Sequence, residues 1–356
     1  MAERRRKNVP NDKEEKLRAS VTGLFCGYGY ERYRPARFES YEVYRRNKDY
    51  IDGDRIITFT DSTGKLLALR PDVTLSIIND LPTSGGVRKY FYDESVFRRD
   101  GDGEYRDLRQ IGVEYVGGAD LYPECEIAAL AVKTLELLGG DCVLTVGNMD
   151  VAEALIKPLG LTDDELVKVL SCIRRKAFHE LKKLLGGNGA DKENAERLLR
   201  LTAVEGEADA ALAEAYPIVV GNAQAKRAAD ELRELTEALK KCGYADKIRL
   251  DFSLIDDFRY YNGAVFRGYA RGAAKAVIRG GRYDNMLKRM GKPGRAVGFA
   301  LDFDAASSLM TEAAVKPTII DRQGLSIAEA LAAAERVAAS GGCAIVCEGG
   351  GEGEER

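Results

Sequence analysis

The chain contains the stretch Gly280-Gly-Arg-Tyr-Asp284, followed by the apolar run Ala296-Val-Gly-Phe299. Glycines inside such runs either let neighbouring backbones approach closely or permit a tight turn between strands, and both interpretations of the Gly280 pair stay open. Short apolar runs on both sides predict strands, and a helix is expected around 284–290. The expected strands are 248–255, 261–269, 274–279 and 296–301.

The first part of the chain predicts further strands of the same sheet. Residues 13–30 have helical spacing and end at the turn Gly27-Tyr-Gly-Tyr30, and a second helix is expected from Asp72 to Asn79. The turns at 61–64 and 100–103 suit hairpins, so the sheet should be largely antiparallel. The expected strands are 54–60, 65–70, 87–98 and 107–116.

Between these two parts the composition changes to Ala, Leu, Glu and Lys with helical periodicity, interrupted by Gly186-Gly-Asn-Gly189. The sequence therefore predicts an α+β fold in which a helical insertion divides one sheet domain. The order after residue 312 is strand, Ala-rich helix and strand, which is a single βαβ unit. The expected division is 1–149 and 247–312 for the two halves of the core, 150–246 for the insertion, 313–347 for the truncated α/β unit and 348–356 for a disordered acidic tail.

Charge and hydropathy limit the classes of function. The 356 residues include 54 basic and 57 acidic side chains, so the net charge of −3 argues against a broad nucleic-acid surface without excluding a local one. No apolar run approaches the roughly 18 residues that span a bilayer. Because no apolar segment follows Met1-Ala-Glu-Arg-Arg-Arg-Lys7, we expect no signal peptide, no membrane association and a cytoplasmic location.

Metal and histidine chemistry are not expected. The seven cysteines, at positions 26, 125, 142, 172, 242, 343 and 347, include no Cys-x-x-Cys pair, so we expect reduced thiols and no structural zinc site. The only histidine, His179, lies in a charged helical stretch and is expected at the surface rather than in an acid–base role. No cofactor is predicted.

Four segments in order carry a family resemblance: Leu69-Arg-Pro-Asp-Val-Thr74, Val96-Phe-Arg98 with Arg109-Gln-Ile-Gly-Val-Glu114, Tyr260-Tyr-Asn-Gly-Ala-Val-Phe266, and the glycine stretch quoted above. Split by a helical insertion, they resemble the catalytic domain of histidyl-tRNA synthetase, which has the class II aminoacyl-tRNA synthetase fold. The resemblance covers residues 10–305. It implies an antiparallel sheet flanked by helices and a homodimer formed through the region around Pro35.

A pocket for an amino acid needs acceptors for the ammonium group, donors for the carboxylate and a shaped wall for the side chain. Taken singly, each candidate residue is more simply a satisfied core or turn group. As an ordered set they match the family. The resemblance implies Asp72 and Thr74 at the amino group, Arg98 and Gln110 at the carboxylate, and Glu114, Tyr260 and Tyr261 around an imidazole ring.

The chain departs from the synthetases where they bind ATP. Asp256 stands where the family has an arginine that contacts the α-phosphate, and such a reversal is worth about 4 kcal/mol each way at ~4 Å and an effective dielectric near 20. Ala305 replaces the arginine of the third class II motif, and the acidic 99–109 loop has Glu104 in place of a Gly-Arg step. If 256–261 is a strand, Arg259 faces away from Asp256 and cannot substitute.

The truncated C-terminal unit is a further departure, because it lacks most of an anticodon-binding domain. A synthetase-like pocket without ATP and tRNA chemistry resembles the regulatory subunits of ATP phosphoribosyltransferase. That resemblance implies a non-catalytic subunit that partners a short-form catalytic subunit in the first step of histidine biosynthesis and mediates feedback inhibition by L-histidine. Two alternatives remain: a divergent histidyl-tRNA synthetase, or a synthetase-like regulator that binds tRNA.

Overall fold

The computed structural model describes residues 12–48, 50–51, 53–82, 85–99, 103–186, 191–310, 318–339 and 344–347. Contacts divide the chain into two compact units, Met1–Met310 and Thr311–Arg356. The predicted acidic tail at 348–356 lies outside the described residues. No helix in the described part of the chain is both long and apolar enough to cross a membrane.

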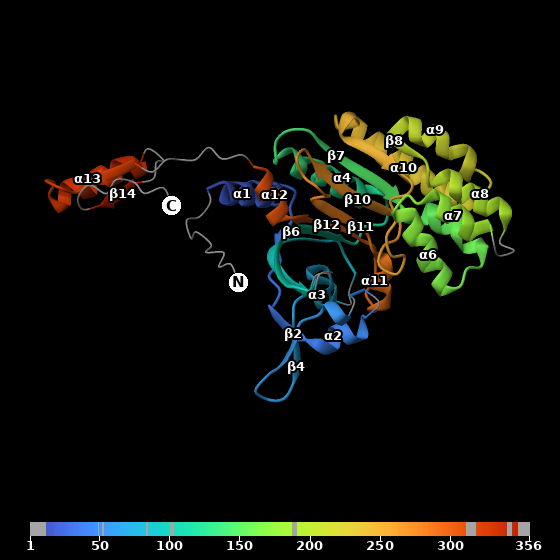
Figure 1. Ribbon diagram of the computed structural model, residues 1–356, viewed down its shortest axis with the longest axis horizontal. Coiled ribbons are helices and arrows are strands. Elements are labelled where there is room, and N and C mark those ends of the chain that lie inside the picture. Colours follow the sequence, from blue (N-terminus) through green and yellow to red (C-terminus); the bar gives the residue numbers. More distant parts are fainter. Residues whose placement is uncertain are drawn as a thin grey trace. The chain divides into compact units, whose positions relative to one another are not determined.

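A nine-stranded sheet forms the centre of the larger unit (Figure 1). Neighbouring strands run antiparallel except for the pairs β1–β5 and β7–β9, which are parallel. The predicted α+β fold with a large, mainly antiparallel sheet is confirmed. In spatial order the strands are β1 (Glu31–Arg32), β5 (Arg88–Arg99), β6 (Tyr105–Val116), β12 (Ala296–Asp302), β11 (Ile278–Arg282), β10 (Ala264–Ala270), β7 (Cys142–Asn148), β9 (Ile248–Asp251) and β8 (Glu205–Glu207).

Three helices cover one face of this sheet: α1 (Asp12–Gly27), α4 (Tyr122–Glu136) and α12 (Phe303–Leu309). The ring of Phe25 in α1 packs 6.3 Å from that of Phe91 in β5 and 5.9 Å from that of Phe299 in β12, measured between centroids. Since side chains alternate along a strand, the neighbours of Phe91 and Phe299 point to the opposite face, where the cavity described below lies.

A smaller three-stranded sheet precedes the first long hairpin, in the order β2 (Phe38–Ser40), β4 (Leu66–Leu69) and β3 (Thr58–Thr60). Fully buried Arg70 joins this sheet to β5, because its guanidinium donates to the carbonyls of Pro35, Ala36 and Ser95 and pairs with Glu94. The short helices nearby are α2 (Tyr41–Arg46), η1 (Gly53–Arg55), α3 (Val73–Asp80) and α11 (Asp284–Arg289).

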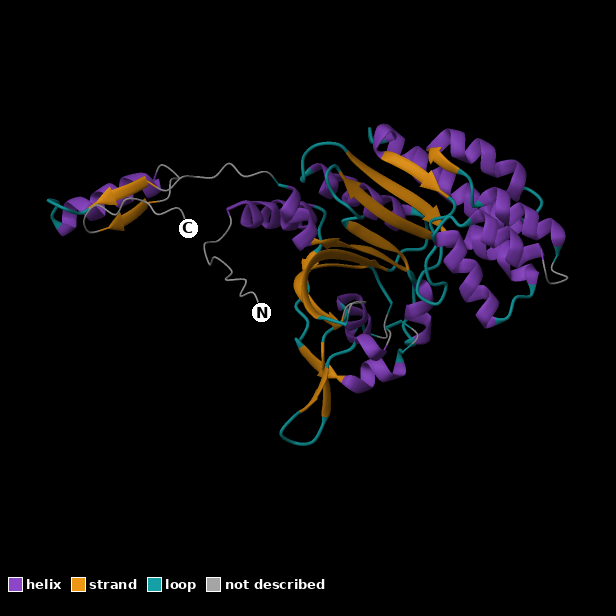
Figure 2. Cartoon of the chain, viewed as in Figure 1, coloured by secondary structure: helices purple, strands orange, loops and turns teal. Residues whose placement is uncertain are grey.

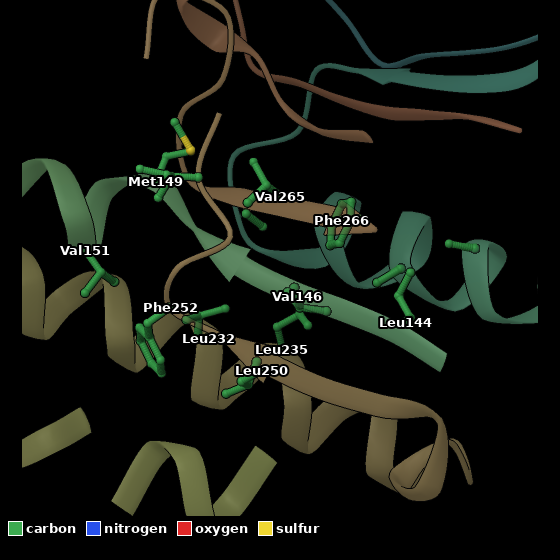
Figure 3. Close-up of a cluster of buried hydrophobic side chains, with 14 of the residues drawn as sticks. Leu144, Val146, Met149, Val151, Leu232, Leu235, Leu250, Phe252, Val265 and Phe266 are labelled. Atoms are coloured by element: carbon green, nitrogen blue, oxygen red, sulfur yellow. The ribbon is translucent and has the colours of Figure 1, made fainter. Parts of the chain in front are cut away.

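The segment between β7 and β9 is mainly helical (Figure 2). Its last helix packs directly on the sheet, because Leu232 and Leu235 lie against Leu144 and Val146 of β7 and Leu250 of β9 (Figure 3). The segment also contributes β8, an edge strand that the sequence did not predict. Its helices are α5 (Met149–Ile156), η2 (Lys157–Leu159), α6 (Asp163–Arg174), α7 (Phe178–Gly186), α8 (Lys192–Leu201), α9 (Ala208–Val219), α10 (Ala223–Lys241) and η3 (Ala245–Lys247).

The smaller unit contains β13 (Thr318–Asp321), α13 (Ile327–Ala339) and β14 (Ala344–Cys347), with the two strands paired in parallel. The predicted single βαβ unit is therefore present. Its apolar side chains include several with large exposed fractions, among them Ile327 at 73% and Leu331 at 58%.

Candidate functional site

The seven predicted binding residues all line one cavity of about 310 Å³. They come from α3, from the β5–β6 hairpin and from the segment just before β10, which are far apart in the sequence. These residues are Asp72, Thr74, Arg98, Gln110, Glu114, Tyr260 and Tyr261. The fold therefore brings together every side chain that the sequence assigned to the pocket.

Glycines make the space for the cavity floor. Gly298 of β12 lies opposite Glu114 of β6, and a Cβ at position 298 would lie 1.8 Å from the Oε2 atom of Glu114. Gly280 and Gly281 lie within β11 rather than in a turn, and a Cβ on Gly280 would lie 2.2 Å from the Gly298 carbonyl oxygen. Of the two interpretations that the sequence left open, the structure therefore supports the one in which Gly280 and Gly281 let neighbouring strands approach closely.

Glu114 is the buried acidic group of the site, with 2% of its surface exposed. Thr74 Oγ1 donates to its Oε1 at 2.6 Å, and the hydroxyl of Tyr283 donates to its Oε2 at 2.5 Å. Burial raises the pKa of Glu114 from its ordinary value of 4.5 to about 8, although the two donors oppose that shift. The carboxyl group can therefore exchange a proton with a ligand nitrogen near neutral pH.

Asp72 and Thr74 are fixed by the start of helix α3. Asp72 is the N-cap residue, and its Oδ1 accepts the backbone N–H of Leu75 at 2.8 Å. Burial raises the pKa of Asp72, while the charge of Arg98 and backbone N–H groups oppose the rise. The Thr74 hydroxyl uses its proton to donate to Glu114, so its oxygen lone pairs remain to accept a hydrogen bond from an ammonium group.

Arg98 and Gln110 lie on the paired strands of the long hairpin. Arg98 Nε donates to the Pro71 carbonyl at 2.7 Å, which orients the guanidinium at the cavity wall. Gln110 pairs with Glu94 across β5 and with Asp302 across β12. Both side chains can thus supply N–H donors to a carboxylate from one side of the cavity.

An aromatic wall closes the cavity, and the sequence predicted only part of it. The rings of Tyr260 and Tyr261 have centroids 4.5 Å apart, and Tyr260 also packs edge-on against Tyr50 at 6.0 Å. Tyr92 and Tyr283 line the same cavity and were missed. Tyr283 could have been found, since it belongs to the glycine stretch, whereas Tyr50 stands in no recognised motif.

The expectations for Asp256 and Arg259 were wrong in two respects. Residues 256–261 form a loop with a turn at 258–260 rather than a strand, so alternation does not separate the two side chains. Arg259 instead pairs with Asp257, with Nη2 and Oδ2 2.5 Å apart. Asp256 lines the cavity but forms an ion pair with Arg267 of β10, so it does not present the uncompensated negative charge that the sequence suggested.

The predicted extent of the acidic loop, residues 99–109, was also wrong. The ladder between β5 and β6 continues to the pair Arg99–Tyr105, so the acidic connection is confined to 100–104 rather than 99–109. Glu104 immediately precedes β6. Ala305 lies in α12 and packs against the hydrophobic core, away from the residues that line the cavity.

Two arginines that the sequence did not assign line the cavity, Arg55 and Arg279. Arg279 lies on β11, next to the glycine pair, and its side chain is exposed. Histidine 179 lies on the exposed surface of α7, as expected. Among the described residues, no three His, Cys, Asp or Glu side chains gather in a way that could hold a metal ion.

A mainly antiparallel sheet with helices on one face and an amino-acid-sized, glycine-floored cavity on the other defines a protein of the class II aminoacyl-tRNA synthetase type. The chain belongs to the histidyl-tRNA synthetase family, whose model matches residues 9–306. The predicted family is therefore confirmed.

The relatives carry the names of ATP phosphoribosyltransferase regulatory subunits and, in one case, of a histidyl-tRNA synthetase as well. A protein of Clostridium acetobutylicum called "ATP phosphoribosyltransferase regulatory subunit" is 27% identical over 305 residues, which are 83% of this chain and 74% of that protein. A solved structure from Bacillus halodurans, named as an ATP phosphoribosyltransferase regulatory subunit/histidyl-tRNA synthetase, matches with a TM-score of 0.81 at 22% identity, over 96% of this chain and 91% of that one.

A chain from the Thermotoga maritima ATP phosphoribosyl transferase (HisG:HisZ) complex matches with a TM-score of 0.63 and 19% identity, over 82% of this chain and 97% of that one. At these identities the two solved structures support the fold.

Proposed function

We propose that this chain is the non-catalytic regulatory subunit of an ATP phosphoribosyltransferase. It is required for the activity of a short-form catalytic subunit in the first step of histidine biosynthesis and for feedback inhibition by histidine. The observation that carries this proposal is that the seven side chains predicted to bind an amino acid line one cavity around Glu114. The name of the C. acetobutylicum relative supports the same role.

The cavity suits L-histidine in both shape and hydrogen bonding. Glu114 accepts from, or donates to, an imidazole nitrogen, and Tyr260 and Tyr261 form the wall beside the ring. At the other end of the ligand, Asp72 and the lone pairs of Thr74 accept from the ammonium group. Arg98 and Gln110 donate to the carboxylate. Histidine thus acts as an effector rather than as a substrate.

The positions that bind ATP in the synthetases, 256 and 305, give little support for synthetase chemistry in this chain. Asp256 is neutralised by Arg267, so this position neither attracts nor strongly repels an α-phosphate. Ala305 has no cationic group and lies in α12. A purified sample that exchanges pyrophosphate into ATP in a histidine-dependent reaction at an ordinary enzymatic rate would favour the divergent synthetase instead.

The assembly follows from the same proposal. The chain forms a homodimer through the region around Pro35, where Arg70 holds the backbone by its bonds to two carbonyls, and it binds the short-form catalytic subunit in the cytoplasm. A net charge of −3 argues against tRNA as a partner. Histidine regulates by binding the inactive assembly more tightly, and a coupling free energy of about 1–3 kcal/mol is sufficient.

Calorimetric titration of histidine tests the effector site. The wild type should bind histidine, and Glu114→Ala should lose most of that binding, because it removes the partner of the imidazole ring. His179→Ala is the matched control, since His179 is exposed on α7, and it should bind as the wild type does. Equal heats from the wild type and Glu114→Ala would remove histidine from this cavity.

A further inference from the structure

The helical insertion contains a groove of its own, with a volume of about 790 Å³. Helices α7 and α8, which pack against each other in the insertion, supply its lining together with Ala203 just after α8 (Figure 1). The groove shares no residue with the cavity around Glu114. It is therefore a second concave surface, and the proposed binding of histidine makes no use of it.

The floor of the groove is apolar. Phe178 and Leu185 come from α7, and Ala195 and Leu199 come from α8. On each helix the two positions are four or seven residues apart, so they lie on one face. Phe178 and Leu199 are only half-buried. An apolar strip that stays open to water between two helices is typical of a surface that another molecule covers.

The same two helices already supply separate side chains to the hydrophobic core. Leu181 of α7 and Leu198 of α8 are fully buried in the main cluster of apolar residues. A surface helix of a globular protein normally needs one apolar stripe, which faces the core. The half-buried Phe178 and Leu199 therefore widen the apolar surface beyond what the packing of the insertion requires.

Positive side chains border the apolar floor. Lys182 of α7, with Lys192 and Arg200 of α8, line the groove and are exposed. None of these three cations forms an ion pair with a described residue. Glu196 is the one acidic residue among the described lining residues. The groove thus carries a local excess of positive charge in a chain whose net charge is −3.

The neighbouring acidic residues on the two helices do not offset this excess. Glu180 of α7 pairs with Arg175 at 3.0 Å, and Glu193 of α8 pairs with Arg197 at 2.6 Å. Both carboxylates are therefore already matched by a cation outside the groove. A partner that covers the apolar floor gains most if it brings its own negative charge to the rim.

The dimensions of the groove fit a helix. Helix α7 has 9 residues and α8 has 10, so at a rise of 1.5 Å per residue each is about 14–15 Å long, or roughly three turns. The distance between packed helices depends on the side chains at the contact, and Ala195 and Ala203 permit a close approach. A nucleic-acid backbone would instead need polar contacts along its track, and the apolar floor offers none.

We propose that the groove between α7 and α8 is a docking site for an acidic amphipathic helix of another protein. The apolar stripe of that helix lies on Phe178 and Leu199, and carboxylates beside the stripe pair with Lys182 and Arg200. Burial of the apolar stripe supplies most of the affinity, while the charged rim selects the partner. The proposal does not depend on whether histidine is the effector.

Fluorescence anisotropy with a synthetic helix tests the docking site on the full chain. The probe is a fluorescein-labelled peptide of about 15 residues, with leucines at i, i+3, i+4 and i+7 spacing and glutamates on both flanks. The comparison peptide has lysine in place of each glutamate. The wild type should bind the glutamate peptide at least about tenfold more tightly than the lysine peptide, and added salt should reduce this difference.

Variants of the groove separate the floor from the rim. Lys182→Glu combined with Arg200→Glu should reverse the preference, so that the lysine peptide binds more tightly. Leu199→Asp should weaken binding of the glutamate peptide by at least about tenfold. Lys241→Glu is the matched control, because Lys241 is an exposed lysine of α10 that does not line the groove, and it should bind as the wild type does.

Four results would overturn the docking site. The first three are no binding of the glutamate peptide by the wild type, equal affinity for the two peptides, and an unchanged preference in the charge-reversed double variant. The fourth is self-association in sedimentation, or binding of single-stranded RNA, that the groove variants abolish while no peptide binds. A reversed preference cannot arise from misfolding, so the double variant decides the question even if Leu199→Asp fails to fold.

Discussion

Replacing Glu114 by glutamine should change how the stability of the protein depends on pH. The side chain is almost fully buried, and its pKa in the folded protein is about 8 against an ordinary value of 4.5. A carboxyl group with a raised pKa binds its proton more tightly in the folded state. Its contribution to stability is therefore fully present below pH 4.5 and is lost as the pH rises through about 8.

The size of the effect follows from the linkage relation. Between these two pH values the folded state holds one proton more than the unfolded state at this site, so the wild type loses about 1.4 kcal/mol per pH unit from this group. Glutamine resembles the protonated acid in shape and does not titrate. The free energy of unfolding of Glu114→Gln should therefore fall less steeply with pH, and the variant should gain on the wild type by several kcal/mol across the window.

Urea unfolding followed by circular dichroism measures this difference at about pH 5, 6, 7 and 8. All other titrating groups are common to both proteins, so subtraction isolates position 114. Parallel curves for wild type and variant across this range would refute the conclusion that Glu114 is held protonated by burial.

Three further substitutions test the architecture of the site. Gly298→Ala places a Cβ 2.4 Å from the Val113 carbonyl oxygen and also against the Glu114 carboxyl group. It should lower the free energy of unfolding by about 1–3 kcal/mol, measured with urea, and abolish histidine binding. Histidine binding at the wild-type level would contradict the close approach of the strands at Gly298. Arg70→Met leaves three carbonyl groups and Glu94 without their hydrogen-bond donor. It should lower the free energy of unfolding by about 3–5 kcal/mol. A loss under about 1 kcal/mol would show that this arginine is not structural. Tyr283→Phe removes a donor that lowers the pKa of Glu114. The pH range over which stability falls should therefore extend to higher pH at its upper end, and an unchanged upper end would argue against that hydrogen bond.

That the seven candidate residues line one cavity was predictable, because they stand in ordered motifs. Asp72 and Thr74 come at the start of a helix, and Glu114 and Gln110 share one face of a strand through period-two alternation. The long β5–β6 hairpin and the helical insertion were likewise visible in the periodicity of the sequence, whereas the central strand β7 and helix α4 were not predicted. Local patterns were sufficient for the features that were predicted.

The charges of the cavity were not predictable, because they depend on register between strands that are distant in the chain. The ion pair between Asp256 and Arg267 joins a turn to β10, and the neighbouring positions of Arg267 and Arg279 arise only from the pairing of β10 with β11. The 256–261 segment was taken as a possible strand, although it forms a loop with a turn at 258–260. The edge strand β8 was missed because three residues, Glu205–Glu207, carry no alternation signal.

Reconstitution with a short-form ATP phosphoribosyltransferase catalytic subunit tests the central claim most directly. The catalytic subunit should be inactive or weakly active alone, active after this chain is added, and then inhibited by histidine; a complex made with Glu114→Ala should be active but insensitive to histidine. No gain of activity on mixing would contradict the regulatory role. Unchanged histidine inhibition with Glu114→Ala would show that the effector acts outside this cavity.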